Sequence, residues 1–459
     1  MSMVVQHNMQ AANANRMLGI TSGAQAKSTE KLSSGYKINR AADDAAGLTI
    51  SEKMRKQIRG LDKASSNAQD GVSSVQTAEG ALTEVHSMLQ RMNELAVQAA
   101  NGTNSKDTDR KAIQDEIDQL NTEIDRVAET TKFNEIYLLK GDDGEKTVNM
   151  NAHDAGLKGT LVDNGSGKAT FTMKALSAGD SVSIGGKNYT IGSTATDAQK
   201  IVDAQKKAGG KVTVNGVEYT YNDTDSKWND AAGKEVKIGT GAAAGEIKIG
   251  AGDKVSDGTT TLTAMTDAKD ATGAANADGI DDNDNSVITA EKAYSLAKDE
   301  LVAANHIGDT ENTAAVAQDT TNKNVFTITT GSAKVANTLS FSLHVGADAD
   351  MTNKITVDID TMNSANLGIK GLNVTDKNGT AATYAIDAIS DAISKVSSQR
   401  SALGAVQNRL EHTIDNLDNI SENTSSAESR IRDTDMAKEM VNYSKNNILA
   451  QAGQSMLCL

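Results

Sequence analysis

Aspartate and asparagine alternate in one short stretch of this chain with the spacing that calcium-binding loops use for their oxygen ligands. The stretch is Asp281-Asp282-Asn283-Asp284-Asn285, and Ile288 follows where such loops carry an apolar residue. Ser286 stands where the loop needs its turn glycine, and Lys292 stands where a bidentate Glu would complete the coordination. We therefore interpret the stretch as a solvated acidic loop and expect no metal site.

The other side chains that enzymes use are not arranged in a catalytic pattern. No two histidines lie three or four residues apart, and none belongs to a His-Glu-x-x-His arrangement. No Gly-Lys pair has both the earlier glycine and the following Ser or Thr of a phosphate-binding loop. We recognise no convergent Ser, His and Asp set. The sequence therefore predicts neither an enzyme nor a cofactor.

Overall composition narrows the classes further. The formal net charge is −15 and the sequence pI about 4.9, so the chain should be repelled by nucleic-acid phosphates and by anionic lipid. The single cysteine, Cys458, can form no disulfide within the chain. No apolar run is long enough for a transmembrane helix, and the N-terminus does not read as a conventional secretory signal. These features favour a protein that binds other proteins.

The N-terminal part of the chain predicts two long helices. Proline is absent from all 459 residues, which permits uninterrupted helices. Between residues 61 and 99, apolar and small residues recur at alternating steps of three and four, which is a heptad seam. Asn101-Gly102 offers a helix end, and a second helix with the same spacing follows between Ile113 and Val127. The seam includes Leu61, Val75, Leu82, Val85, Leu89 and Met92.

The C-terminal part carries a matching seam. Arg400 and Gln407 occupy two of its positions, and polar seam residues fix register at some cost in stability. A seam of this length needs a partner helix, and the N-terminal seam is the natural one. The two ends of the chain should therefore pack together. The apolar members of this seam are Ile389, Ile393, Val396, Leu403, Leu410, Ile414 and Leu417.

The middle of the chain, residues 146–370, should then leave the helical bundle and return to it as an inserted outer domain. Asn215-Gly216 predicts a two-residue hairpin, and Gly185-Gly186-Lys187 predicts a similar one. The fold class is therefore a long coiled-coil-like bundle of N- and C-terminal helices with an inserted strand-rich domain of the α+β or β class. Further strands are expected at 235–238, 246–249, 324–330, 338–345 and 354–359, and a helix at 290–304.

The extreme ends of the chain show a flatter pattern. Residues 4–34 and 435–459 carry scattered apolar residues among many Asn, Gln, Ser and Ala. Helices so rich in small residues are not stable alone. We expect them to need neighbours, which in an assembling subunit include other copies of the chain.

Several segments at both ends, in the same order, resemble bacterial flagellins, the subunits of the flagellar filament. Residues 146–370 resemble nothing that we recognise, as the variable outer region of that family would. The match at 90–103, QRMNELAVQAANGT, is especially dense. The other matching segments are 32–39, 41–48, 76–82, 123–127, 133–134, 403–410 and 429–435.

The resemblance implies a structural subunit that leaves the cell unfolded through the flagellar type III export apparatus with an export chaperone. Such subunits polymerise beneath a filament cap into an extracellular helical homopolymer for motility. On this pattern, residues 1–45 and 426–459 form filament-core helices, 46–145 and 371–425 form the helical inner domain, and 146–370 forms the variable outer domain. Flagellins usually continue for a dozen or so residues past a stretch like Ala450 to Gly453, so we expect a shortened C-terminal core helix, with an unusual Cys458.

The resemblance also implies a host partner, Toll-like receptor 5. The same surface suits contacts between subunits, and both uses are compatible. Two other hypotheses stay open, a hook–filament junction protein and a flagellin with a catalytic outer domain; the dense match at 90–103 favours a flagellin over a junction protein. The residues that carry over as receptor contacts are Arg91, Leu95 and Glu116, with Gln90, Glu94 and Gln98 nearby.

Overall fold

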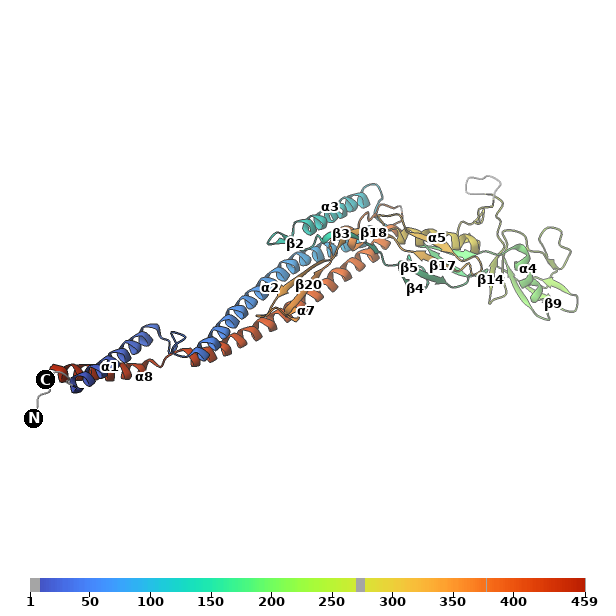
Figure 1. The fold of residues 1–459 in the computed structure, drawn as a ribbon. Helices are drawn as coiled ribbons and strands as arrows, with labels where there is room; N and C mark the ends of the chain where they lie inside the picture. The colour runs from blue at the N-terminus through green and yellow to red at the C-terminus, as the bar shows by residue number, and fades with distance from the viewer. Residues whose placement is uncertain (1–8, 270–276, 377, 459) are drawn as a thin grey trace, which may run out of the picture. The chain divides into compact units, whose positions relative to one another are not determined.

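Long helices occupy both ends of the chain and strands occupy its middle (Figure 1). The computed structural model describes residues 9–269, 277–376 and 378–458. The chain forms two compact units, one of residues 1–76, 340–358 and 402–459, the other of residues 77–339 and 359–401. Each unit draws on both ends of the chain, which confirms the predicted fold class of paired terminal helices with a strand-rich insertion.

The first unit contains two helix pairs (Figure 1). Helix α1 (Met9–Ser34) lies beside α8 (Met436–Cys458). Helix α2 (Ala45–Ala100) lies beside α7 (Thr380–Arg432), and both of these helices continue into the second unit. Because no proline interrupts them, α2 and α7 extend over 56 and 53 residues.

The α2 and α7 helices run antiparallel and pack through their seams. Leu61 packs with Leu417, and Ala68 packs with Leu410. Between these layers the Ser65 hydroxyl donates to an Asp418 carboxylate oxygen at 2.9 Å. The sequence spacing of three and four residues therefore places these side chains on the inner face of each helix, as heptad packing requires.

A β-hairpin belongs to the helical unit, although the sequence placed it in the outer domain. Strands β19 (Leu339–His344) and β20 (Lys354–Ile359) are antiparallel neighbours in a two-stranded sheet joined through the short 3-10 helix η1 (Met351–Asn353). A side chain on Gly71 would overlap Leu343, and the Asn67 amide donates to the His344 carbonyl at 3.0 Å. The expected outer segment 146–370 is thus interrupted, because glycine in the α2 seam leaves room for the hairpin.

In the second unit, a buried arginine fixes the turn between α2 and α3 (Asp109–Thr130). Arg110 is 1% exposed, and its guanidinium donates to the carbonyls of Ala99 and Asn101 at 2.8 and 3.2 Å. It also donates to the Asp376 carbonyl at 2.9 Å, just before α7. A cation that binds the last carbonyls of a helix satisfies groups that have no partner within the helix.

The chain enters and leaves the strand-rich region at one place. Strand β3 (Asp142–Asn149) pairs antiparallel with β18 (Ser332–Asn337), and Asn149 is opposite Ser332. We call these two strands the β3–β18 stem. Short strands β1 (Lys132–Phe133) and β2 (Ile136–Tyr137) form a hairpin between α3 and the stem.

The first part of the strand-rich region packs a helix on two sheets. Its core contains Phe171 and Phe326, whose ring centroids are 6.5 Å apart, together with Tyr294 of the helix. The helix is α5 (Ala290–Asn305), which confirms the helix predicted at 290–304. One sheet has the order β16 (Ala315–Gln318), β17 (Val325–Thr329), β5 (Lys168–Met173), β4 (Gly159–Gly165), and the other β15 (Val287–Ile288), β7 (Lys187–Ile191), β6 (Ser181–Ile184).

The second part is a five-stranded sheet packed on α4 (Ala195–Ala204). Trp228 is 1% exposed in its core, with its ring centroid 5.2 Å from that of Tyr221. The sheet order is β10 (Lys227–Asn229), β9 (Val217–Asn222), β8 (Lys211–Val214), β13 (Lys254–Ser256), β14 (Thr261–Thr263). The remaining short elements are β11 (Lys237–Ile238), β12 (Glu246–Ile247) and α6 (Ser364–Leu367).

Both predicted hairpins are present. Val214 pairs with Val217 across Asn215-Gly216, whose φ angles of 51° and 85° suit a tight hairpin turn. The other hairpin differs slightly from the prediction, because Lys187 already pairs with Ile184 and the turn consists of Gly185-Gly186 alone. The strands predicted at 235–238 and 246–249 are shorter, and β11 and β12 pair in parallel.

Candidate assembly and recognition surfaces

Most residues of the two predicted seams are buried. Ile393 and Ile414 are partly exposed, and the polar seam residue Arg400 lies 3.5 Å from Glu79 as an ion pair. Gln407 donates to Glu411 on its own helix at 2.9 Å. The α2 and α7 seams are therefore closed within the chain. The buried members are Leu61, Val75, Leu82, Val85, Leu89, Met92, Ile389, Val396, Leu403, Leu410 and Leu417.

The α1 and α8 helices leave large apolar side chains in solvent. On α8, Val441 is 68% exposed and Ile448 is 67% exposed, and both line a shallow apolar hollow with Met440 and Leu449. On α1, Met17 and Ile20 are also exposed. Exposed apolar surface of this kind is typical of interaction sites.

A short joint connects the two helix pairs of the first unit. The Lys37 amide donates to the Arg432 carbonyl at 2.6 Å, and the Thr434 amide donates to the Gly35 carbonyl at 2.9 Å. The Arg432 guanidinium lies 4.9 Å from the Tyr36 ring centroid and also binds Glu52 at 2.6 Å. The hydrogen bond from Arg432 lowers the pKa of Glu52. The segment after α1 is thus bound to the segment before α8 through both backbone and side chains.

Arg91 is the centre of an exposed ionic network on α2 and α3. Its Nε donates to Glu116 Oε1 at 2.8 Å, and its Nη1 donates to Glu94 Oε2 at 3.2 Å. These hydrogen bonds, to Glu116 first and to Glu94 second, raise the pKa of the Arg91 guanidinium. Exposed ion pairs contribute little to stability, because solvent screens them. The network therefore fixes the direction of charged groups at a surface more than it stabilises the fold.

The other receptor candidates divide by exposure. Gln90 and Gln98 are exposed, and Gln90 lies 3.1 Å from the His86 ring nitrogen Nε2. Leu95 is only 2% exposed, so the expectation of a surface contact at this residue has to be corrected. Its position on α2 falls on the inner face together with Met92 and Ala99, whereas Arg91 and Glu94 fall outside it.

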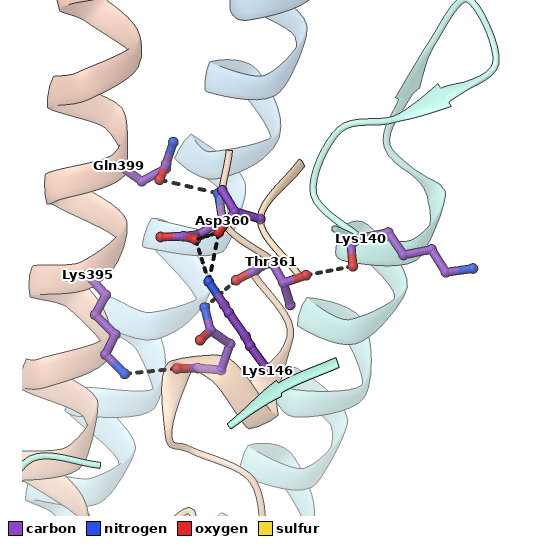
Figure 2. Close-up of polar contacts among 8 residues, drawn as sticks. Lys140, Lys146, Asp360, Thr361, Lys395 and Gln399 are labelled. Atoms are coloured by element: carbon purple, nitrogen blue, oxygen red, sulfur yellow. Dashed lines mark hydrogen bonds and ion pairs between the residues drawn. The ribbon is translucent and has the colours of Figure 1, made fainter. Parts of the chain in front are cut away.

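A polar cluster joins the stem to α7 in the second unit (Figure 2). Lys146 of β3 donates to Asp360 and to Thr338, both at 2.8 Å, and Thr338 also donates to Asp360 at 2.6 Å. Burial raises the pKa of Asp360, but the hydrogen bonds from Lys146 and Thr338 outweigh burial and leave it below its usual value.

Two residues of α7 complete the cluster. Lys395 donates to the Asn366 carbonyl at 2.9 Å, and burial lowers the pKa of its amine. Gln399 accepts from the Asp360 amide at 3.5 Å (Figure 2). Sequence reasoning missed this cluster, because its members are scattered over the chain and share no motif.

The acidic stretch that begins at Asp281 forms a hydrogen-bonded turn. Asp281 is 3% exposed and accepts from the amides of Thr266, Asn283 and Asp284. Its carboxylate oxygens are therefore used by the backbone. In the described part of the chain, no group of three or more His, Cys, Asp or Glu residues is placed to hold a metal ion. None of the helices in residues 9–269, 277–376 and 378–458 is long and apolar enough to span a membrane.

Comparisons with known proteins agree with this architecture. The family model of the bacterial flagellin N-terminal helical region matches residues 5–143, and that of the C-terminal helical region matches residues 386–458. A flagellin of Clostridium tyrobutyricum is 38% identical over 458 residues, covering 99% of this chain and 98% of that protein. Flagellin B of Vibrio anguillarum is 34% identical over 467 residues, covering 100% of this chain and 96% of that protein.

A solved structure, FliC from Burkholderia pseudomallei, covers 74% of this chain and 99% of that chain at 18% identity. Its TM-score of 0.24 is too low to support an argument. The paired terminal helices, the inserted region and the sequence matches define a structural subunit of the bacterial flagellum. The chain belongs to the flagellin family, whose members are subunits of the flagellar filament.

Proposed function

We propose that this chain polymerises with copies of itself into the extracellular flagellar filament that drives motility. The observation that carries the proposal is the exposed apolar surface of α1 and α8, including Val441 and Ile448. Within the described residues, Ser28 is the sole buried side chain of α1, so this pair has no core of its own. Helices of this kind gain stability from neighbours. Contacts that repeat head to tail without closing into a ring produce a filament.

The proposal assigns each part of the chain a place in the filament. Residues 1–45 and 426–459 form its core, residues 46–145 and 371–425 form the next shell, and residues 146–370 face outward. The hairpin of β19 and β20 is an exception to this last range, since it packs on α2. The chain acts as a structural protein and not as an enzyme.

The route to the filament is part of the same proposal. The subunit is held by an export chaperone, passes unfolded through the flagellar type III apparatus and folds beneath the filament cap. The absence of proline among all 459 residues supports this route, because it removes slow X-Pro isomerisation from refolding at the tip.

The test is seeded growth of the purified full chain at high sulfate, observed by electron microscopy, with sedimentation of the unseeded protein. We expect filaments that lengthen from the seeds. A junction protein would attach at the ends without lengthening, and persistent monomers of normal helicity would overturn the proposal. Assaying the full chain with a panel of hydrolase substrates tests the hypothesis of a flagellin with a catalytic outer domain. Turnover of any substrate would overturn the assignment as a purely structural protein.

A second proposed partner is Toll-like receptor 5, which would bind the network of Arg91, Glu94 and Glu116 with Gln90 and Gln98. The exposed ionic geometry of Arg91 supports this proposal, and buried Leu95 would act by holding α2 in place. We expect Arg91→Ala to weaken binding of the receptor ectodomain at least about tenfold, the loss of a central contact. Lys111→Ala is the control, because Lys111 forms a separate exposed pair with Asp115 on α3. Equal binding by both variants would contradict the assignment.

A further inference from the structure

The α2 helix carries a basic stripe on the first unit. Lys56, Arg59 and Lys63 follow at steps of three and four, so they share one face of the helix, and all three are exposed. Other faces of α2 are occupied at this level. Asp62 and Ser65 bond to α7, and Gly60 approaches Ala347 of the hairpin. The basic stripe thus lies on the face that the chain leaves uncovered.

The α7 helix carries a longer acidic stripe. Glu411, Asp415, Asp418 and Glu422 follow at steps of four, three and four, and all four are exposed. No Lys or Arg occupies residues 410–422 on this helix. Four like charges on one helix face repel each other and destabilise the isolated helix slightly. A partner of opposite charge would relieve this repulsion.

No member of either stripe forms an ion pair within the described part of the chain. Lys56, Arg59 and Lys63 belong to none of its ion pairs, and neither do Asp415 and Glu422. Other charges on the same helices are paired, for example Arg55 with Glu428 at 3.4 Å. The stripes therefore differ from Arg55 and Glu428, which the fold pairs internally.

The two stripes lie at the same level along the helix pair. Leu61 packs with Leu417 and Ala68 with Leu410 in antiparallel register. This register places Lys56 level with Glu422 and Lys63 level with Asp415. Each of these spans covers about 10 Å at the rise of an α-helix. A second copy placed alongside the first, with little axial shift, brings the stripe of one within reach of the other.

We propose that the basic stripe of α2 in one copy binds the acidic stripe of α7 in the adjacent copy. The partner is a second copy of this chain, and the proposal rests on the proposed filament function. Because the two faces are different, the contact is heterologous and repeats from copy to copy. Complementary exposed charges set encounter rate and register more than affinity. The apolar surfaces of α1 and α8 supply the affinity, and the stripes select the neighbour and its height.

The experiment is a charge swap in the full chain, read as the seeded elongation rate at low ionic strength. One variant reverses α2 with K56E, R59E and K63E. A second reverses α7 with E411K, D415K and E422K; Asp418 is left unchanged because it bonds to Ser65. We expect the elongation rate of each variant alone to fall at least about tenfold, because like charges that face each other slow an electrostatically steered association. An equimolar mixture of the two, or a chain with all six changes, should recover most of the wild-type rate.

The matched control for the α2 reversal is a variant with K207E, K234E and K237E, which makes the same change in net charge as that reversal on exposed residues of the strand-rich region. It should elongate at the wild-type rate, and circular dichroism should show equal helicity in every variant. The inference would be overturned, while the filament function stands, if either triple variant elongates like wild type. It would also be overturned if the chain with all six changes elongates as slowly as each triple variant. A wild-type chain that forms no filaments from seeds would overturn both.

Discussion

Each of the two helix pairs of the first unit combines an N-terminal with a C-terminal helix, but the pairs differ in how far their apolar residues are buried. In α2 and α7, apolar residues recur with heptad spacing and are buried within the chain, as Leu61 and Leu410 show. In α1 and α8, apolar residues are scattered among small polar ones, and Ile448 remains exposed. Regular spacing closes a core within one molecule, whereas scattered apolar residues leave a surface for other molecules.

The largest effect should come from breaking the closed pair. Leu410 is fully buried against Ala68, and Leu410→Asp places an unpaired carboxylate there. We expect a loss of about 3–5 kcal/mol in the free energy of unfolding, because an uncompensated buried charge costs about that much. Chemical denaturation followed by circular dichroism measures it. Leu89→Asp should behave similarly in the second unit, where Leu89 is also fully buried.

A neighbouring substitution serves as the control for this prediction. Arg409 is exposed on the same turn of α7 and belongs to no ion pair of the described residues. Arg409→Asp should change stability by less than about 0.5 kcal/mol, as is usual for surface sites. If Leu410→Asp unfolds no more easily than Arg409→Asp, the seam assignment is wrong.

The open pair should respond in the opposite way. Ile448→Asp alters an exposed side chain, so the unfolding of the monomer should change by less than about 0.5 kcal/mol. Seeded elongation should nevertheless fall at least about tenfold, because the carboxylate would be buried in the filament. Normal elongation by this variant would show that α8 does not use this face for assembly.

Glycines give a finer comparison of the two pairs. A side chain on Gly71 in α2 would overlap Leu343, so Gly71→Ala should destabilise the chain by about 1–3 kcal/mol, the usual range for overpacking. Gly23 in α1 has open space within 4 Å. Gly23→Ala should therefore keep the stability of the monomer or raise it by about 0.5–1 kcal/mol through helix propensity. Thermal unfolding of both variants would show equal shifts if the pairs were equally closed.

The smallest effect concerns the polar cluster beside the closed pair in the second unit. The pKa of Asp360 is lowered overall, so its ionised form contributes stability above the unfolded pKa near 3.8. This contribution is lost as pH falls through the folded pKa. Asp360→Asn should lower stability at neutral pH by less than about 1 kcal/mol, since the carboxylate is half exposed, and the difference should vanish at acidic pH. Denaturation at several pH values measures it.

Asp387 on α7 provides a control of opposite sign. Burial raises its pKa, Asp154 and Asp391 add to this effect, and His153 opposes it. A raised carboxyl pKa costs stability once pH exceeds the folded pKa. Asp387→Asn should therefore raise stability slightly at neutral pH and have no effect below the unfolded pKa. Two variants with the same sign of effect would contradict the electrostatic account of this region.

The long helices could be predicted from sequence because their seams repeat over many turns. The same holds for α5 and the hairpin at Asn215-Gly216, where local signals suffice. The place of the β19–β20 hairpin could not be predicted, since it depends on the contact of Leu343 with a glycine far away in sequence. The parallel pairing of β11 with β12 likewise has no local signal.

The candidate surfaces follow the same rule. The resemblance had already named Arg91 and Glu116, but the exposure of Arg91 and its hydrogen bond to Glu116 could be seen only in the fold. The resemblance named Leu95 but did not show that this residue is buried. The fold shows that Leu95 is buried on the same face of α2 as Met92. That the basic and acidic stripes lie at the same level could also not be predicted. It depends on the register between α2 and α7, and a repeating seam allows several registers that differ by whole helical turns.

The β3–β18 stem makes the strand-rich region an exchangeable module. Asn149 and Ser332 are antiparallel partners, so their Cα atoms lie only about 5 Å apart and a two-residue turn can join them. The segment between these two residues can lengthen, shorten or be replaced without displacing the β3–β18 stem, through which the chain returns to α7. Natural variation can therefore change the strand-rich region while α2 and α7 keep their register, and a foreign domain can be grafted at the same junction.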